Sequence, residues 1–425
     1  MWGATVRAIG GLRGAARHAL LLSPGLADAA LSSLAGFAVS LYAVRTLEGP
    51  ALGAYSLYLS AYLLASLFAQ HLLFLPSQIA ALKAPRDARP AILGPTLWRG
   101  ALLSVLVAPI AAGSGVILSG EVPGSTLVAL GAGAAILTVI APLQDHVRST
   151  LHLSGQHGRA AAVSGVQLAC TASALGVLIL LGIPDAWVPF GALALGTAAS
   201  GVAGLQLTQV GSADGFELPP SRSLMRTGMA LLPAALVQEA AVFASAATLA
   251  SLASAAALGS AEAARIVARP VQAFSLGVSR TLAPRLMEAG EARSLSQSRR
   301  TAGLYVAATG AAGLLYLAVV GPPHALNPFE AMAPAAYGDD GLAALFIVAA
   351  LAGAILQVPR GILLGASEGK TVLVLAAVAA VSRVAVVAVL AASIGAYALP
   401  AAQLISLGLS GGLGLRTTRR LLDRP

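Results

Sequence analysis

The sequence predicts an all-α integral membrane protein, with about 12 transmembrane helices arranged as two parallel six-helix bundles around a central cavity. Three observations predict this class: the composition, a series of long apolar runs and an internal repeat. Of the 425 residues, 57% are hydrophobic and only 10% are charged. A soluble domain carries about 25% charged residues because water must cover its surface. The chain is therefore expected to lie in lipid.

Each helix that crosses a bilayer needs about 20 mostly apolar residues. Runs of this kind fall near 24–45, 51–76, 97–119, 125–144, 161–182, 187–208, 226–249, 256–279, 302–321, 341–359, 371–393 and 397–415. They divide the chain into a cytoplasmic amphipathic lead-in (1–23), an N-terminal bundle (24–208), a cytoplasmic linker (209–225), a C-terminal bundle (226–415) and a basic cytoplasmic tail (416–425).

The connections between these runs alternate in charge. Most of the 26 basic residues lie before the first run, after the last run or in the connections that follow even-numbered runs. The opposite connections hold acidic residues such as Glu121 and Asp185. Because positive residues stay cytoplasmic during insertion, both termini are expected in the cytoplasm. This pattern also accounts for the net charge of +9 without nucleic acid as a partner.

Two pairs of short segments suggest that the halves are repeats. Residues 153–159 (LSGQHGR) resemble residues 364–370 (LGASEGK), at a shift of 211. Ala51-Leu52-Gly53 also matches Ala257-Leu258-Gly259, at a shift of 206. Both matches relate a run to the sixth run after it. An even shift preserves orientation, so the halves are predicted to be parallel.

Several charges fall inside the apolar runs, where an ionised side chain is costly unless it faces a cavity or a partner. Glu262, Arg265 and Arg269 recur at i, i+3 and i+7, which places them on one face of a helix. Glu239 and Arg383 are expected at a comparable depth on other helices. These residues are predicted to line an aqueous pathway that attracts an anionic head group. An ion pair between Glu239 and an arginine, or snorkelling, is the structural alternative.

Two further charges lie in the first run. Asp28 is near its cytoplasmic end, where an acid is also favourable beside a helix N-terminus. It is interpreted as either a coupling acid or a counter-charge, as is Glu239. Arg45 lies at the outer end, where it either contributes to the pathway or snorkels to the interface.

Catalytic signatures are absent from the sequence. It contains no HExxH, CxxC or P-loop pattern, so neither an enzyme nor a cofactor or metal site is expected. The acidic pair Asp339-Asp340, in the one long external connection, leaves a membrane glycosyltransferase or polysaccharide polymerase as an alternative.

The first hairpin carries a family resemblance. Residues 28–37 (DAALSSLAGF) with 44–56 (VRTLEGPALGAYS) resemble the first hairpin of bacterial polysaccharide-export (O-antigen-type) flippases. These belong to the multidrug/oligosaccharidyl-lipid/polysaccharide (MOP) exporter superfamily. Residues 143–159, from Leu143 to Arg159, resemble the segment between the fourth and fifth helices of that family. Glu48 departs from the small or apolar residue usual before Gly-Pro, and the chain lacks room for the two extra helices of lipid II flippases.

The resemblance implies an alternating-access flippase that moves an undecaprenyl-pyrophosphate-linked saccharide across the bacterial inner membrane. It implies membrane lipids as surroundings, with a polysaccharide polymerase and glycosyltransferases as partners. The candidates for contact with the pyrophosphate are Arg45, Arg265, Arg269 and Arg383, because guanidinium groups form forked hydrogen bonds with phosphate. A cation-coupled multidrug antiporter of the same superfamily is the alternative within transport, and a scaffold subunit without transport activity is another.

Overall fold

The computed structural model describes residues 27–208, 219–320, 332–337 and 339–422. The expected lead-in (1–23) lies outside the described residues, as do residues 209–218 of the expected linker. Every regular element in the described part is helical, as the composition predicts.

The N-terminal half is an up-and-down series of helices. The first helix is Ala27–Thr46, and α2 (Gly49–Ala69) continues through a π-helix, η1 (Gln70–Phe74), into α3 (Leu75–Ala81). The π-helix lies just before Pro76, which has no N–H with which to continue the regular ladder. The half is completed by η2 (Arg89–Ile92), α4 (Leu93–Gly113), η3 (Ser114–Leu118), α5 (Gly124–Leu153), α6 (His157–Leu180) and α7 (Val188–Leu207).

The C-terminal half repeats this layout with longer helices. It consists of α8 (Ser221–Leu252), α9 (Ala255–Glu291), α10 (Leu295–Val320), η4 (Ala335–Tyr337), α12 (Asp340–Ile355), α13 (Gln357–Gly365), α14 (Gly369–Ile394), η5 (Gly395–Tyr397) and α15 (Ala398–Leu422). Since α15 continues to Leu422, residues 416–422 of the expected tail extend this helix by about two turns.

The predicted number of spans agrees with the helices observed. Ten segments of the described chain are long and apolar enough to cross a membrane. One of them, Gly369–Leu422, holds two packed helices, because the chain turns at Gly395 with a φ of +53°. The remaining helix, α9, is long enough but carries three charges, Glu262, Arg265 and Arg269, within one stretch. With these two additions, the described chain has twelve helical segments long enough to cross a membrane.

The proposed repeat falls on equivalent turns. The turn from α5 to α6 and the turn from α13 to α14 each contain a residue with positive φ, Gly155 at +77° and Ser367 at +62°. In both turns the amide after that residue donates to the carbonyl five residues earlier, from Gln156 to Leu151 and from Glu368 to Leu363. The structural equivalence is thus a shift of 212, one residue more than the best sequence match.

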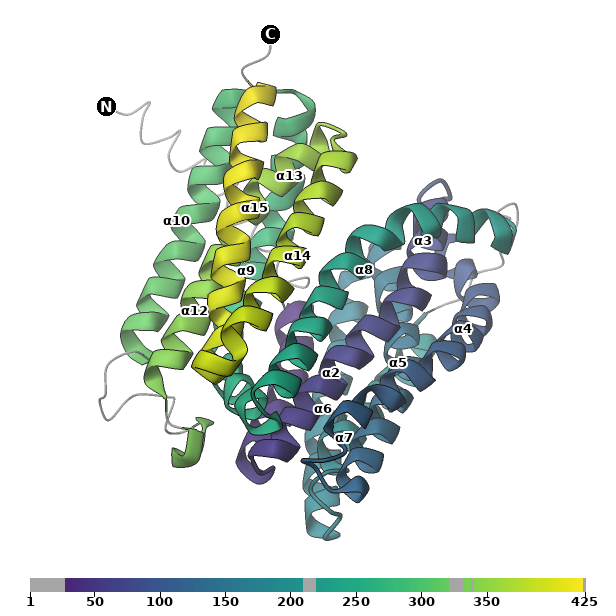
Figure 1. Ribbon diagram of the computed structural model, residues 1–425. Helices are drawn as coiled ribbons and strands as arrows, with labels where there is room; N and C mark the ends of the chain where they lie inside the picture. The colour runs from purple at the N-terminus through teal and green to yellow at the C-terminus, as the bar shows by residue number, and fades with distance from the viewer. Residues whose placement is uncertain (1–26, 209–218, 321–331, 338, 423–425) are drawn as a thin grey trace, which may run out of the picture.

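The two bundles meet at one end and diverge towards the other (Figure 1). At the closed end, the beginnings of α2 and α9 are in backbone contact, and a Cβ on Gly53 would overlap the carbonyl of Ala255. In the same way, a Cβ on Gly259 would overlap the carbonyl of Gly49. The glycines of the sequence repeat are therefore a symmetric pair that lets the helices touch, as small residues do in membranes.

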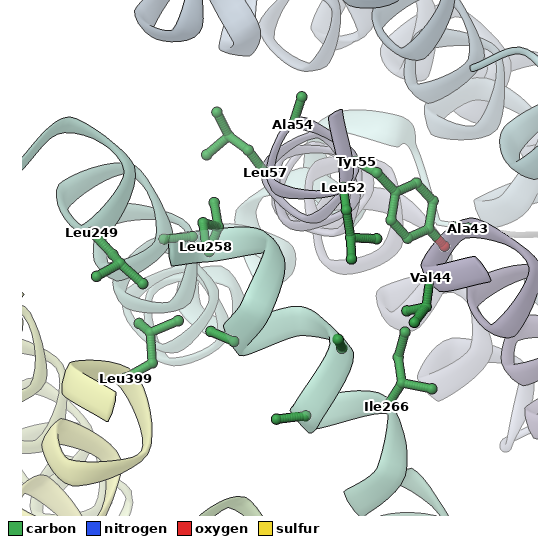
Figure 2. Close-up of a cluster of buried hydrophobic side chains, with 14 of the residues drawn as sticks. Ala43, Val44, Leu52, Ala54, Tyr55, Leu57, Leu249, Leu258, Ile266 and Leu399 are labelled. Carbon is green, nitrogen blue, oxygen red and sulfur yellow. The ribbon is translucent and has the colours of Figure 1, made fainter. Parts of the chain in front are cut away.

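Apolar side chains surround this crossing. Leu52 and Tyr55 of α2 lie beside Leu258 and Ile266 of α9 in one buried cluster, which Leu399 joins from the start of α15 (Figure 2). Two polar links reinforce the contact, since Glu121 accepts from the backbone N–H of Ala255 at 2.7 Å and the Tyr337 hydroxyl donates to the carbonyl of Leu47 at 3.1 Å.

Helix α8 packs against both bundles. Leu224 and Leu232, in its first half, pack among residues of α2, η1 and α4, and Gly228 lies against the backbone of Leu72. The second half of α8 packs along α14 instead (Figure 1).

Candidate functional site

The charges predicted on one face of α9 form a buried network at the junction of the two halves. Glu262 is 1% exposed. Its Oε2 accepts from the Nε of Arg265 at 2.8 Å and from the hydroxyl of Ser56, on α2, at 2.9 Å. Its Oε1 pairs with Arg269 at 3.1 Å. One carboxylate therefore pairs with two arginines, which leaves the group with a net positive charge, while it receives a hydrogen bond from the opposite half.

Arg269 also reaches the first helix. Its guanidinium donates to the backbone carbonyl of Gly36 at 3.3 Å and to the hydroxyl of Ser40. Ser40 in turn lies 3.0 Å from the hydroxyl of Tyr55. Arg269 is thus bonded on both sides of the bundle junction, and these contacts offset the cost of partly burying its charge.

A cavity of about 630 Å³ lies in the C-terminal half. Its walls come from α8, α9, α12, α13, α14 and α15, with Tyr305 from α10. The volume is within the range of small-molecule sites. The cavity lies beside the network of Glu262, because Arg265 lines it while also pairing with that carboxylate.

The described lining of the cavity is electropositive. Arg265, Arg360 and Arg383 face it, with Glu239 as the acidic residue among them. Glu239 and Arg383 line the same cavity, yet no ion pair joins them within the described residues, so the structural pair considered from the sequence is not formed. The Nε of Arg383 is buried and lacks a hydrogen-bond partner in the described chain.

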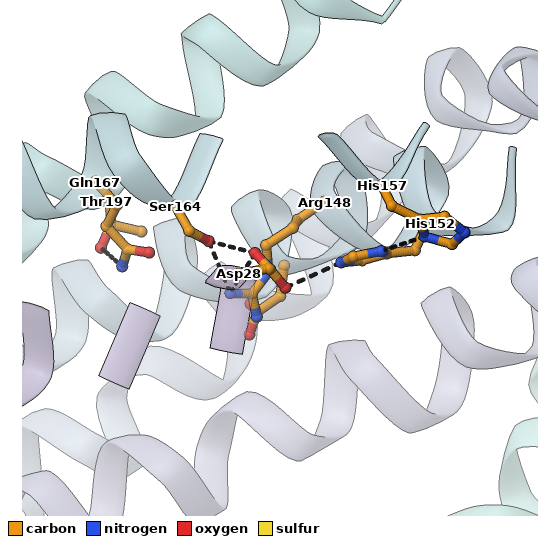
Figure 3. A network of polar contacts seen from close by, with 8 residues as sticks. Asp28, Arg148, His152, His157, Ser164, Gln167 and Thr197 are labelled. Carbon is orange, nitrogen blue, oxygen red and sulfur yellow. Dashed lines mark hydrogen bonds and ion pairs between the residues drawn. The ribbon is translucent and has the colours of Figure 1, made fainter. Parts of the chain in front are cut away.

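Asp28 lies in a separate polar network in the N-terminal half (Figure 3). It is 3% exposed and accepts from the hydroxyl of Ser164, on α6, at 2.5 Å. Its second oxygen lies 2.9 Å from Nε2 of His152, and the guanidinium of Arg148 lies 3.7 Å away. Arg148 is also paired with Asp145 at 2.7 Å. These contacts tie the first helix to α5 and α6.

Two other candidates lie away from the cavity. Arg45 is exposed near the end of the first helix and is not among the described residues of the lining. Asp339 caps α12 through the backbone N–H of Leu342 at 2.9 Å and accepts from the hydroxyl of Tyr397 at 2.6 Å. Its contacts are those of a helix cap rather than of a catalytic carboxylate. Among the described residues, no group of three or more His, Cys, Asp or Glu side chains is placed to hold a metal.

The sequence did not single out Arg360 or the partners of Asp28. Arg360 lies just after Pro359, where the predicted tenth span ended, and the structure continues that span as α13. Its guanidinium donates to Gln238 at 3.3 Å at the cavity wall. Arg148 and His152 lie in the connection between the predicted spans 125–144 and 161–182, which was expected on the same cytoplasmic side as Asp28.

Comparison with known proteins identifies the fold but not a sequence family. No family model and no curated protein matches the sequence. Among solved structures, the inward-facing conformation of a multidrug resistance MATE family transporter of the MOP superfamily covers 92% of this chain and 94% of its own, with a TM-score of 0.74 and 14% identity. An outward-facing conformation of such a transporter, with 15% identity, covers 95% of this chain and 94% of its own at a TM-score of 0.64.

The lipid II flippase MurJ, in an inward closed conformation, is also similar. It covers 92% of this chain and 86% of its own, with a TM-score of 0.63 and 11% identity. The likeness therefore shows a multi-pass helical fold that this chain shares with these proteins. Specifically, the chain has the fold of MOP superfamily transporters, in agreement with the resemblance seen at the first hairpin.

Proposed function

We propose that this protein is a flippase that exports an undecaprenyl-pyrophosphate-linked saccharide across the bacterial inner membrane by alternating access, for polysaccharide biosynthesis. The observation that carries the proposal is the charge of the cavity, where three arginines face one glutamate in the described lining. In a low-dielectric site, such an excess of positive charge favours an anionic head group. Arginine also suits pyrophosphate, because its forked donors match phosphate oxygens.

The arrangement of the bundles supports alternating access. We propose that the closed end, with Gly53 and Gly259, faces outward, and that both termini are cytoplasmic, as the distribution of positive charge predicts. The described conformation is then inward-facing, in line with its higher similarity to the inward-facing MATE structure. The bundles 24–208 and 226–415 are the proposed moving units, with α8 connecting them. Polymerase and glycosyltransferases are the proposed partners.

A cation-coupled multidrug antiporter is the second candidate, because the MATE structure has a higher TM-score than the flippase. The cavity does not favour it. Organic cations bind acidic or aromatic sites, whereas this described lining has a single acid, Glu239, and a single aromatic residue, Tyr305.

Leaflet-specific labelling of lipid-linked oligosaccharide in a deletion strain tests the proposal. We expect the lipid to accumulate in the cytoplasmic leaflet and to return to its normal distribution when the gene is restored. A normal distribution in the deletion strain, together with a changed drug-resistance profile, would favour the antiporter instead.

A further inference from the structure

Two helices of the C-terminal half share an eight-residue motif. Residues 272–279 of α9 read QAFSLGVS and residues 403–410 of α15 read QLISLGLS. Both follow the pattern Gln-X-X-Ser-Leu-Gly-X-Ser. Since the polar positions recur at i, i+3 and i+7, each helix carries a stripe of one amide and two hydroxyls on one face.

Both stripes face the same cavity. All six polar residues are in its lining: Gln272, Ser275, Ser279, Gln403, Ser406 and Ser410. The wall contributed by α14 is different, since Val372, Leu375 and several alanines line the cavity there. The cavity therefore has a hydroxyl- and amide-bearing side, an apolar side, and arginines beside both.

The polar stripes retain unused hydrogen-bonding capacity. The hydroxyl of Ser275 is buried without a partner in the described chain, and no hydrogen bond of the Gln272 amide is found there. Ser406 and Ser410 donate to carbonyls of their own helix, at 2.9 and 2.8 Å, which leaves their oxygens free to accept. Polar groups inside a membrane protein are costly unless they are satisfied, so this wall is suited to a hydroxyl-rich ligand.

We propose that the paired Gln-X-X-Ser-Leu-Gly-X-Ser stripes of α9 and α15 form the saccharide-binding wall of the cavity, and that they hydrogen-bond the sugar hydroxyls while Arg265 and Arg383 hold the pyrophosphate. This inference rests on the proposed flippase function and adds where the sugar is bound. A wall of amides and serines does not require one sugar stereochemistry. Such a wall binds the saccharide through several neutral hydrogen bonds, each of which contributes a modest free energy. The saccharide can therefore be released when the cavity opens to the opposite side of the membrane.

The test compares two lipids that differ only in the sugar. Purified protein in nanodiscs is titrated with a polyprenyl-pyrophosphate-linked oligosaccharide and with the same polyprenyl pyrophosphate without sugar. We expect the wild type to bind the glycosylated lipid more tightly. In Gln272→Leu/Gln403→Leu, affinity for the glycosylated lipid is expected to fall about tenfold, towards that of the sugar-free lipid. Arg383→Gln is expected to weaken the binding of both lipids alike.

Two controls separate binding from folding. Gln297→Leu makes the same substitution at an exposed position of α10 outside the cavity and is expected to change neither affinity. Ser275→Ala/Ser406→Ala removes only two hydroxyls, so it tests the wall in a variant with little change in volume. Equal affinity of the wild type for both lipids would overturn the saccharide wall alone. Binding of neither lipid would overturn the proposed function and this inference with it.

Discussion

Gly49 at the start of α2 lies against Ala256 of α9, and a Cβ built on Gly49 would be 3.4 Å from the Cβ of Ala256. This spacing is close to the 3.5–4.5 Å typical of disulfide-bonded cysteines. The two residues come from opposite halves of the chain, 207 positions apart, and mark the point where the bundles meet. If the transporter alternates, this contact must open during each cycle.

The pair Gly49→Cys/Ala256→Cys is therefore expected to crosslink on mild oxidation and to stop transport reversibly. The variant is made in a Cys170→Ala background, which removes the single natural cysteine. Crosslinking is followed by a mobility shift on gels, and transport by leaflet-specific labelling before and after reduction. Single-cysteine variants serve as controls. Full transport by the crosslinked protein would mean that the closed end does not open.

Glu262→Gln is expected to destabilise the protein, because it leaves Arg265 and Arg269 without their common counter-charge. Breaking a buried ion pair by removing one partner costs about 3 kcal/mol. The amide oxygen of the glutamine accepts a weaker hydrogen bond from Ser56 than the carboxylate does, so the contact between α9 and α2 is also weakened. A thermal-shift measurement in detergent checks this, with Glu291→Gln at the exposed end of the same helix as the control. An unchanged Tm would show that the network contributes little to stability.

Arg269→Ala and Arg383→Ala are expected to differ, although both arginines were predicted to contact the substrate. Arg269 bonds Glu262 and the first helix, so its loss is expected to lower the Tm as well as to stop export. Arg383 lines the cavity without an ion pair in the described chain, so its loss is expected to stop export with little change in Tm. Arg299→Ala, at an exposed position of α10, is the control. Normal surface polysaccharide in both variants would contradict the role of these arginines.

Most of the fold was predictable from the sequence, because lipid imposes strong constraints on length and charge. The twelve spans follow from apolar runs, and the glycine pair was visible as the match of Ala51-Leu52-Gly53 with Ala257-Leu258-Gly259. What those glycines do was not predictable, since a repeat does not indicate which helices cross. The π-helix before Pro76 and the two-sided packing of α8 likewise depend on contacts between distant residues.

The candidate site was predictable in composition rather than in arrangement. The spacing of Glu262, Arg265 and Arg269 correctly placed them on one face of α9. Spacing does not reveal that Ser56 donates a hydrogen bond to Glu262, or that Arg269 donates one to Ser40, across the junction. The depth of a residue in its span predicted that Glu239 and Arg383 could be neighbours, and both do line one cavity. The motif shared by α9 and α15 was visible in the sequence, but its meaning depends on their facing a common space.

The remaining prediction concerns Asp28, which was interpreted as either a coupling acid or a counter-charge. Its contact with Arg148 favours the second role. Asp28→Asn keeps a side chain able to bond Ser164 and His152. It leaves Arg148 with a single acidic partner in the described chain, Asp145, which is partly exposed. We therefore expect Asp28→Asn alone to lower stability by about 1–2 kcal/mol, because hydrogen bonds to a neutral amide are weaker than those to a carboxylate and Arg148 loses a counter-charge.

A double-mutant cycle distinguishes the two roles. If Asp28 serves as a counter-charge, Asp28→Asn/Arg148→Gln removes both charges, and we expect it to regain part of the lost Tm and to restore transport. If Asp28 is the coupling acid, the double variant regains stability but stays inactive, because no other group replaces its proton- or cation-binding carboxylate. Asp145→Asn is the matched control, since it removes the more exposed acid bound to the same arginine. The comparison of Tm with transport rate across the four proteins of the cycle therefore separates a structural charge from a functional one.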